Sequence, residues 1–136
     1  MARRDGVRLS LVLGLAGLLG CGGSGGAAAA PAKLSRIELT SGGVTEHDLS
    51  ASAGDQIEFV NNDSAPHQPT SNPHPFHTDC PELNGPVLEP GGRFTAVVSG
   101  GRTSCGFHDH LNPNDARFQG TIAITGAATS GGGTTY

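Results

Sequence analysis

Histidine and cysteine carry most of the chemistry that this sequence could perform. The chain has 136 residues, among them six histidines and three cysteines. Five of the histidines fall into two groups, His67, His74 and His77 in the first and His108 and His110 in the second. Imidazole nitrogen is the commonest metal ligand in proteins. The sequence therefore predicts a transition-metal site to which both groups contribute.

The second histidine group allows two kinds of site. His108 and His110 are two residues apart, so on an extended strand both rings face the same side. They would then form a chelating pair for an all-histidine site with His67 or His77. Cys105 lies three residues before His108, so on a straight strand these two side chains face opposite sides. They share a metal only if the chain bends after the cysteine, and the spacing leaves both possibilities open.

Two histidines are expected to have other roles. His47 stands alone in a polar segment, and we interpret it as a surface side chain. His74 lies in a proline-rich stretch, where we expect its ring to hydrogen-bond the loop backbone rather than to hold a metal.

Composition excludes several classes of protein. Glycine contributes 22 residues and proline 9, and charged residues are only 15%, which argues against a helix bundle. Lysine and arginine together number 8, the net charge is −4 and no basic cluster occurs, so we expect no nucleic-acid partner. The chain shows no Ser-His-Asp arrangement, phosphate-binding glycine loop or acid/base carboxylate pair, so we expect no enzymatic activity.

Short alternating strands should build the fold. Apolar residues alternate with polar ones around Ile37 and Leu39, around Ile57 and Phe59, and again near Ile122. Gly- and Pro-containing turn clusters separate these runs, which is typical of an antiparallel sandwich or barrel. Residues 63–90 are proline-rich and contain few aliphatic side chains, and we predict a long ordered loop there. Long loops in small domains are usually functional.

The first residues have the pattern of an export signal. Arginines at positions 3, 4 and 8 precede a short apolar run, a combination typical of a signal peptide. The run ends in Leu-Leu-Gly-Cys21, which resembles the lipobox of bacterial lipoproteins. We predict a signal peptide over 1–20, a lipidated Cys21, a flexible tether over 21–33, a folded domain over 34–126 and a flexible tail over 127–136. The protein should be exported and anchored in a membrane of the cell envelope, facing the periplasm or on the outer membrane.

Several segments together resemble the cupredoxin family, whose members include plastocyanin. Residues 57–67 are similar to the strand and first histidine of that family, and 88–94 to the turn that follows. Residues 105–108, with the strand at 120–124, resemble its Cys-x-x-His loop and last strand. The runs 71–77 and 107–113 resemble those of a bacterial subgroup. The resemblance implies an all-β, cupredoxin-like antiparallel Greek-key β-sandwich.

The resemblance also implies a cofactor, copper. In the family two histidines and one cysteine thiolate hold the metal, and His67, Cys105 and His108 match those positions. Phe118 stands where the family has its axial methionine. The implied function is an exported copper-binding electron carrier with a redox partner protein. The alternatives are a copper-handling or sequestering protein with an all-histidine type-2 site, drawn from His67, His77, His108 and His110, and a metal-free structural domain.

A disulfide competes with the thiolate ligand for one sulfur. Once Cys21 is lipidated, Cys80 and Cys105 are the remaining cysteines, in a compartment that forms disulfides. A bridge between them would stabilise a small domain with a modest core. It would also exclude Cys105 from the metal and leave an all-histidine site. The sequence leaves both states open, and we favour the disulfide.

Overall fold

The structure is a computed structural model, and it describes residues 30–126. Its strands are β1 (Leu34–Thr40), β2 (Gly43–Val44), β3 (Asp48–Ser52), β4 (Gln56–Asn61), β5 (Pro69–Ser71), β6 (Arg93–Val97), β7 (Ser104–Asp109) and β8 (Gln119–Thr125). Two short 3-10 turns complete the list, η1 (Pro81–Leu83) and η2 (Ala116–Phe118). Within residues 30–126 no helix has the length and hydropathy of a transmembrane span. The predicted signal peptide, Cys21 and the tail over 127–136 lie outside the described residues.

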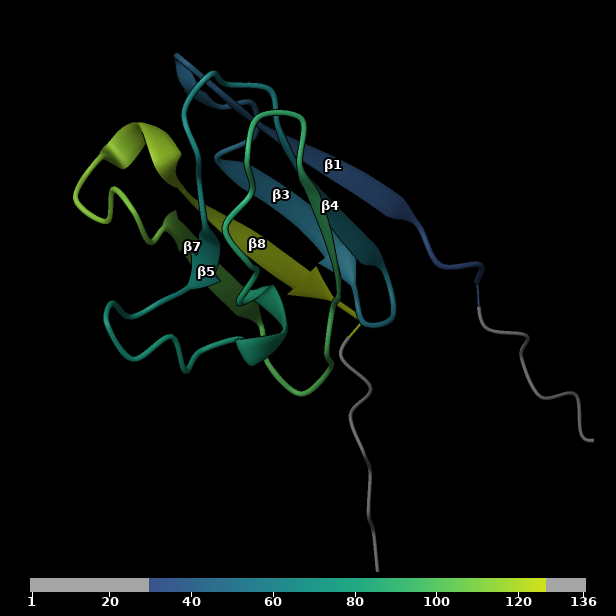
Figure 1. The fold of residues 1–136 in the computed structure, drawn as a ribbon. Coiled ribbons are helices and arrows are strands. Elements are labelled where there is room, and N and C mark those ends of the chain that lie inside the picture. Colours follow the sequence, from purple (N-terminus) through teal and green to yellow (C-terminus); the bar gives the residue numbers. More distant parts are fainter. Residues whose placement is uncertain (1–29, 127–136) are drawn as a thin grey trace, which may run out of the picture.

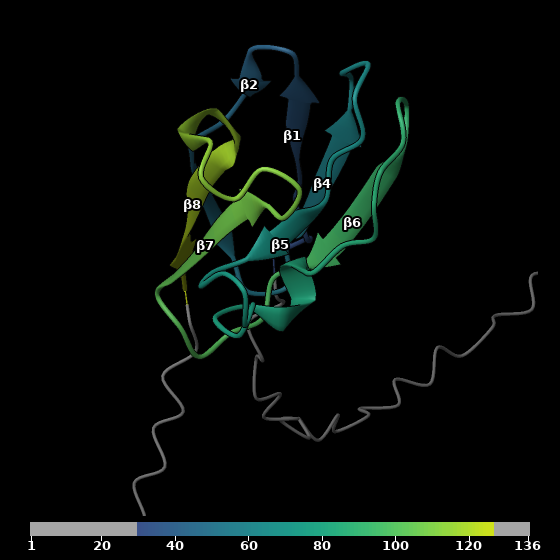
Figure 2. The same ribbon diagram turned by 60° about the vertical axis from the view of Figure 1, so that its left-hand side comes forward.

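The strands form two sheets packed face to face, as Figure 1 and Figure 2 show. One sheet has the order β2-β1-β4-β6 and the other β3-β8-β7-β5. The predicted all-β sandwich is confirmed, but the pairing is not purely antiparallel. β1 runs parallel to β4, and β3 runs parallel to β8. These parallel pairs arise because the chain crosses to the second sheet at β3 and returns at β4, and parallel neighbours need such crossovers.

The core lies between the sheets and follows the predicted alternation. Ile37, Ile57 and Phe59 from one sheet and Ile122 from the other are fully buried. Phe107 of β7 meets Phe59 of β4 edge to face, with ring centroids 5.4 Å apart. This contact joins the two sheets and defines the inner face of β7.

Two segments differ from the sequence-based expectation. Residues 104–109 form a regular strand, β7, between β8 and β5, rather than part of a loop. The long segment 63–90 contains β5, which pairs with the end of β7, and the turn η1. Between β5 and η1, residues 72–80 form a loop that extends beyond the edge strand β5 (Figure 1). This loop and β7 carry the histidines that matter for the site.

Candidate metal centre

The pleat of β7 places its histidine on the outer face of the second sheet. Successive strand residues point to opposite faces, so Cys105, Phe107 and Asp109 face inward and His108 faces outward. The outward ring of His108 lies against Thr70 of β5, its register partner. His110 follows the strand, and its ring lies on the same side as that of His108. The predicted same-side placement of these two rings is thus what the structure has.

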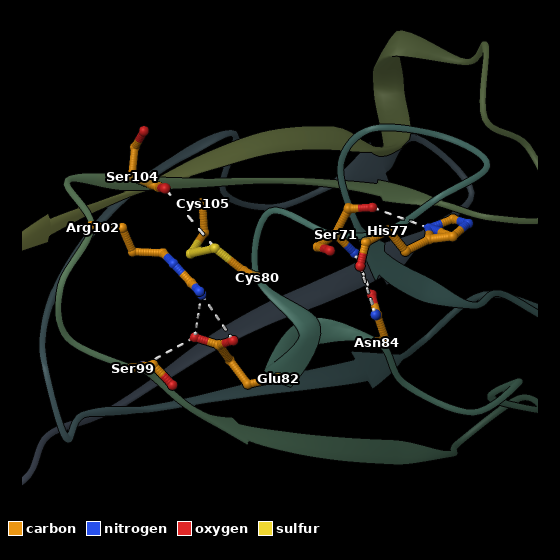
Figure 3. Close-up of a disulfide and its surroundings, with 9 residues drawn as sticks. All are labelled: Ser71, His77, Cys80, Glu82, Asn84, Ser99, Arg102, Ser104 and Cys105. Atoms are coloured by element: carbon orange, nitrogen blue, oxygen red, sulfur yellow. Dashed lines mark hydrogen bonds and ion pairs between the residues drawn. A yellow bond between two sulfur atoms is a disulfide. The ribbon is translucent and has the colours of Figure 1, made fainter.

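The loop over residues 72–80 folds back against this outer face. The backbone N–H of Asn72 donates to the carbonyl of Gly106 in β7 at 3.0 Å. The N–H of Asp79 donates to the carbonyl of Asn72 at 2.9 Å, which closes the loop on itself. The side-chain amide of Asn84 donates to the carbonyl of His77 at 2.9 Å (Figure 3). These bonds fix the loop so that its two histidines meet those of the β7 end.

Four imidazoles converge where the loop meets the strand: His74, His77, His108 and His110. One nitrogen of each lies within 4.8 Å of one nitrogen of every other. The ring centroids of His77 and His108 are 5.1 Å apart, and those of His77 and His110 are 4.8 Å apart. A metal–nitrogen bond of about 2.0–2.1 Å places ligand nitrogens about 3.3–4.2 Å apart, so the four rings need only a small inward shift to hold one transition-metal ion.

Hydrogen bonds fix the tautomers of two of these rings. The Nδ1 of His77 is 3.1 Å from the carbonyl oxygen of Ser71, which can only accept, so Nδ1 carries the proton (Figure 3). The Nδ1 of His108 likewise donates to the amide oxygen of Asn72 at 2.8 Å. In both neutral rings Nε2 therefore carries the free lone pair, and that of His77 faces His110 within the cluster. An outer partner that holds the Nδ1 proton is the usual arrangement of metal-binding histidine.

The remaining contacts of these nitrogens are compatible with a metal. The Nδ1–H of His110 donates to the Nε2 of His77 at 3.0 Å, a bond that exists only while both nitrogens lack another ligand. The hydroxyl of Thr70 lies 3.3 Å from the Nε2 of His108. It can donate instead to the backbone carbonyl of His108, which is 3.4 Å away. Neither contact blocks a nitrogen from an incoming cation.

The electrostatics of the cluster favour the neutral form of two of its rings, His77 and His108. Burial, followed by the proximity of His110 and His74, holds the pKa of His77 below its usual range. Burial also lowers the pKa of His108, helped by His77, His74 and His110 and opposed by Asp109. A neutral imidazole has the free lone pair that a metal requires. At neutral pH the site can therefore accept a cation without first expelling protons from these two rings.

His67 is not part of this cluster, although we expected it to converge with His108. It is 2% exposed and lies on the core side of the second sheet. Its Nδ1 is 2.8 Å from Asp109 Oδ2 and its Nε2 is 3.0 Å from Asp63 Oδ2. Both ring nitrogens are thus bound to carboxylates on opposite sides of the ring. Because Asp109 and His108 project from opposite faces of β7, a ring held by Asp109 cannot join His108.

Cys105 is bonded to Cys80, and the disulfide is therefore the state that the structure has. The two Cα atoms are 5.8 Å apart, and both residues are buried (Figure 3). Cys105 also faces the core, since β7 does not bend after it, whereas His108 faces outward. The ligand set of His67, Cys105 and His108 that the family resemblance implied is therefore not assembled.

The position at which that resemblance would place copper is closed by other side chains. The ring of Phe118 packs on that of His67, with centroids 4.5 Å apart. Asp109, rather than a cysteine, projects from the end of β7 toward His67 and is 1% exposed. The donors present fit copper in the four-histidine cluster and do not fit a thiolate site beside His67.

Sequence reasoning missed His74 as a member of the cluster and missed the residues that orient the rings. Only the spacing of His74, three residues before His77 in one loop, could have indicated that the two act together. The roles of Ser71 and Asn72 depend on how the loop folds back. His47 lies outside the cluster, is exposed, and bonds through Nδ1 to the carbonyl of Gln119.

Comparison with known proteins shows similarity at the level of structure. No protein-family model matches the chain, and no curated protein sequence does. A purple cupredoxin from Nitrosopumilus maritimus is 20% identical, covers 66% of this chain and 98% of its own, with a TM-score of 0.54. A variant of fern plastocyanin is 20% identical over 66% of this chain and 99% of its own, with a TM-score of 0.52. The Cu(I) form of an amicyanin variant is 15% identical over 72% of this chain and 87% of its own, with a TM-score of 0.51. At these identities the similarity shows the fold, a cupredoxin-like β-sandwich.

Proposed function

We propose that this domain binds one copper ion in the four-histidine cluster and handles or sequesters the metal. The observation that carries the proposal is the convergence of four imidazoles within 4.8 Å, two of them with their Nδ1 protons already held. The cupredoxin-like fold supports copper as the metal, since one of its structural neighbours is described as a Cu(I) form. An all-imidazole site suits Cu(II), whereas softer sulfur ligands suit Cu(I).

The chain supplies binding and orientation in this site. His77 and His108 offer Nε2 nitrogens whose direction is fixed by Ser71 and Asn72. His110 and His74 complete the donor set from the strand end and the loop. Bound copper would supply a positive charge and a redox couple, without the thiolate that makes blue-copper centres intensely coloured.

Titration with Cu(II) tests the proposal directly. We expect the metal-free domain to bind about one equivalent with a pale, type-2 EPR spectrum and no intense band in the visible region. His108→Ala should abolish this high-affinity site, whereas His47→Ala, an exposed histidine outside the cluster, should bind as the wild type does. Equal copper binding by the wild type and His108→Ala would show that the cluster is not the site.

Electron transfer, the role favoured from the sequence, is the second candidate. The observation in its favour is the rigid support of two ligand rings. His77 is held by the Ser71 carbonyl of β5, and His108 is held by the Asn72 side chain. The Cys80–Cys105 disulfide fixes the end of the loop that carries Asn72. A carrier must keep its metal in both oxidation states with little rearrangement. Voltammetry separates the candidates: a carrier cycles reversibly without losing copper, and a handling protein releases copper on reduction.

We further propose that the protein is exported and tethered to a membrane through a lipidated Cys21. The support is the basic, short apolar leader that ends in Leu-Leu-Gly-Cys21, followed by a Gly- and Ala-rich stretch. Such a tether would hold the copper site close to a membrane surface, where a redox or copper-exchange partner protein could reach it.

A further inference from the structure

The four histidines of the cluster differ in how firmly the fold holds them. We infer that His74 is the exchangeable ligand, through which copper enters the site and leaves it, while His77, His108 and His110 form the fixed base. This inference rests on the proposed function and assigns a direction of access to that site. It concerns ligand exchange alone, without a change in the oxidation state of the metal.

The three base ligands are anchored by hydrogen bonds. The ring of His108 is 3% exposed and is held by the Asn72 amide oxygen. His77 is held at its ring by the Ser71 carbonyl and at its own carbonyl by Asn84. The backbone N–H of His110 donates to the Gln68 carbonyl at 2.8 Å. Moving the ring of His77 or of His108 would break its bond to Ser71 or Asn72, and the bond to Gln68 fixes the backbone of His110 at the strand end.

His74 has none of this support. Its side chain is exposed, and among residues 30–126 its ring takes part in no hydrogen bond. Its ring centroid nevertheless lies 5.5 Å from those of His77 and His108 and 5.1 Å from that of His110. The ring is therefore close enough to close the site and is free to rotate away from it.

The backbone around His74 confines its motion to the side chain. Pro73 and Pro75 flank it, and proline fixes its own φ and restricts the residue before it. Rotation of the His74 side chain therefore opens the solvent side of the cluster while the loop keeps His77 in place. In an exchange step one Cu–N bond to His74 breaks and one bond to an incoming nitrogen or oxygen donor forms. The three base ligands hold the ion throughout.

Exchange kinetics of single variants test the assignment. We expect His74→Ala to bind Cu(II) with an affinity lowered by about tenfold and to release it to EDTA about tenfold faster than the wild type. His108→Ala should lose more than about a hundredfold in affinity, beyond the usual cost of losing an outer-shell partner. His47→Ala serves as the exposed-histidine control. Circular dichroism checks that each variant is folded.

The possible outcomes separate the inference from the function on which it rests. If His74→Ala lost copper as completely as His108→Ala, His74 would be an equal base ligand and the inference would be wrong. Release at the wild-type rate would mean that His74 is not a ligand. If the wild type itself bound no copper at the cluster, the proposed function would fail, and the inference with it.

Chemical labelling gives a readout that does not depend on exchange. Diethyl pyrocarbonate modifies accessible neutral imidazole, so His74 and His47 should react fastest in the metal-free protein. One equivalent of Cu(II) should protect His74 and leave the labelling of His47 unchanged. Slow labelling of His74 in the metal-free protein, or equal labelling with and without copper, would overturn the assignment.

Discussion

The imidazole of His67 donates through Nδ1 to Asp109 Oδ2 at 2.8 Å, and both side chains are buried between the sheets. The same carboxylate accepts the backbone N–H of Gln68 and of Leu111, and the amide of Asn112. Burial raises the pKa of Asp109, but these hydrogen bonds outweigh it and hold the pKa below its usual value. Asp109 thus ties His67 to the segment that leaves β7, one residue before His110.

Replacing Asp109 should therefore destabilise the domain. In Asp109→Asn the negative charge is lost. One acceptor oxygen becomes an NH₂ group, which then faces N–H groups that also donate. We expect the free energy of unfolding to fall by about 3–5 kcal/mol, the usual cost of breaking a buried pair. Denaturant unfolding measures this loss, with Asp48→Asn, an exposed position, as the control. A change below about 1 kcal/mol would show that the pair is only weakly stabilising.

The strands could be predicted because their signal is local. Ile37 and Leu39, like Ile122 and Ile124, alternate with polar or small neighbours, and a period of two needs no knowledge of distant residues. The same pleat correctly predicted that His108 and His110 face one side. The parallel pairing of β1 with β4 could not be predicted in this way, because it depends on the path of the chain between sheets.

The site was only partly predictable because its partners are far apart in the sequence. His67 has the context of a ligand, but its neighbour in space is Asp109, which lies 42 residues away. The sequence around His74 predicts a bond to the loop backbone, because nothing local shows that the loop folds back on β7. The count of cysteines favours the disulfide, and the structure confirms it.

The metal-free domain should lose stability on mild acidification. The pKa values of His77 and His108 lie below the usual histidine value of 6.5 because burial and neighbouring imidazoles disfavour the charged forms. The unfolded chain therefore binds more protons than the folded chain just below pH 6.5. The contribution of these two rings to the unfolding free energy is complete above that pH and decreases as the pH falls below it. Thermal unfolding between pH 5 and 7 measures the effect, in a window above the usual titration of carboxylates. His77→Ala should reduce the slope, and an unchanged slope in that variant would contradict the assignment.

Membrane anchoring is expected to depend on Cys21. Lipid modification requires the thiol of that residue, so Cys21→Ser should either release the domain into the soluble fraction or leave an unprocessed precursor. Ser24→Ala, in the same stretch, is the matched control. Fractionation and intact-mass measurement of the mature chain provide the readout. Processing and membrane association of Cys21→Ser at the wild-type level would refute the lipoprotein interpretation.

Asn72 should control copper affinity without touching the metal. Its amide oxygen holds the Nδ1 proton of His108, so Asn72→Ala frees that ring to rotate. We expect copper affinity to fall by about 10–100-fold, the usual effect of losing such a partner. Asn62→Ala is the control, since that exposed side-chain amide bonds to Glu38 and lies outside the histidine cluster.

A second variant reaches the same contact from β7. Gly106 has no side chain, and a Cβ there would collide with the Asn72 amide. Gly106→Ala should therefore displace Asn72 and weaken copper binding in the same direction. If both variants bound copper with wild-type affinity, the orientation of His108 would not depend on Asn72. Competition titration with a chelator of known affinity measures all three variants.

Cys80→Ser should weaken the fold without creating a blue-copper centre. The bridge closes a loop with a sequence separation of 25, and the chain-entropy relation gives about 3.5 kcal/mol for a loop of this size. The freed Cys105 thiol faces the core near Glu82 (Figure 3). It lies on the opposite face of β7 from His108. It therefore cannot reach the copper that His108 holds. We expect lower unfolding free energy, one titratable thiol in the 34–126 domain and an unchanged pale type-2 spectrum. An intense visible band in Cys80→Ser would mean that β7 rearranges to bring Cys105 and His108 to one metal, and the four-histidine site would then not be the only copper site this chain can form.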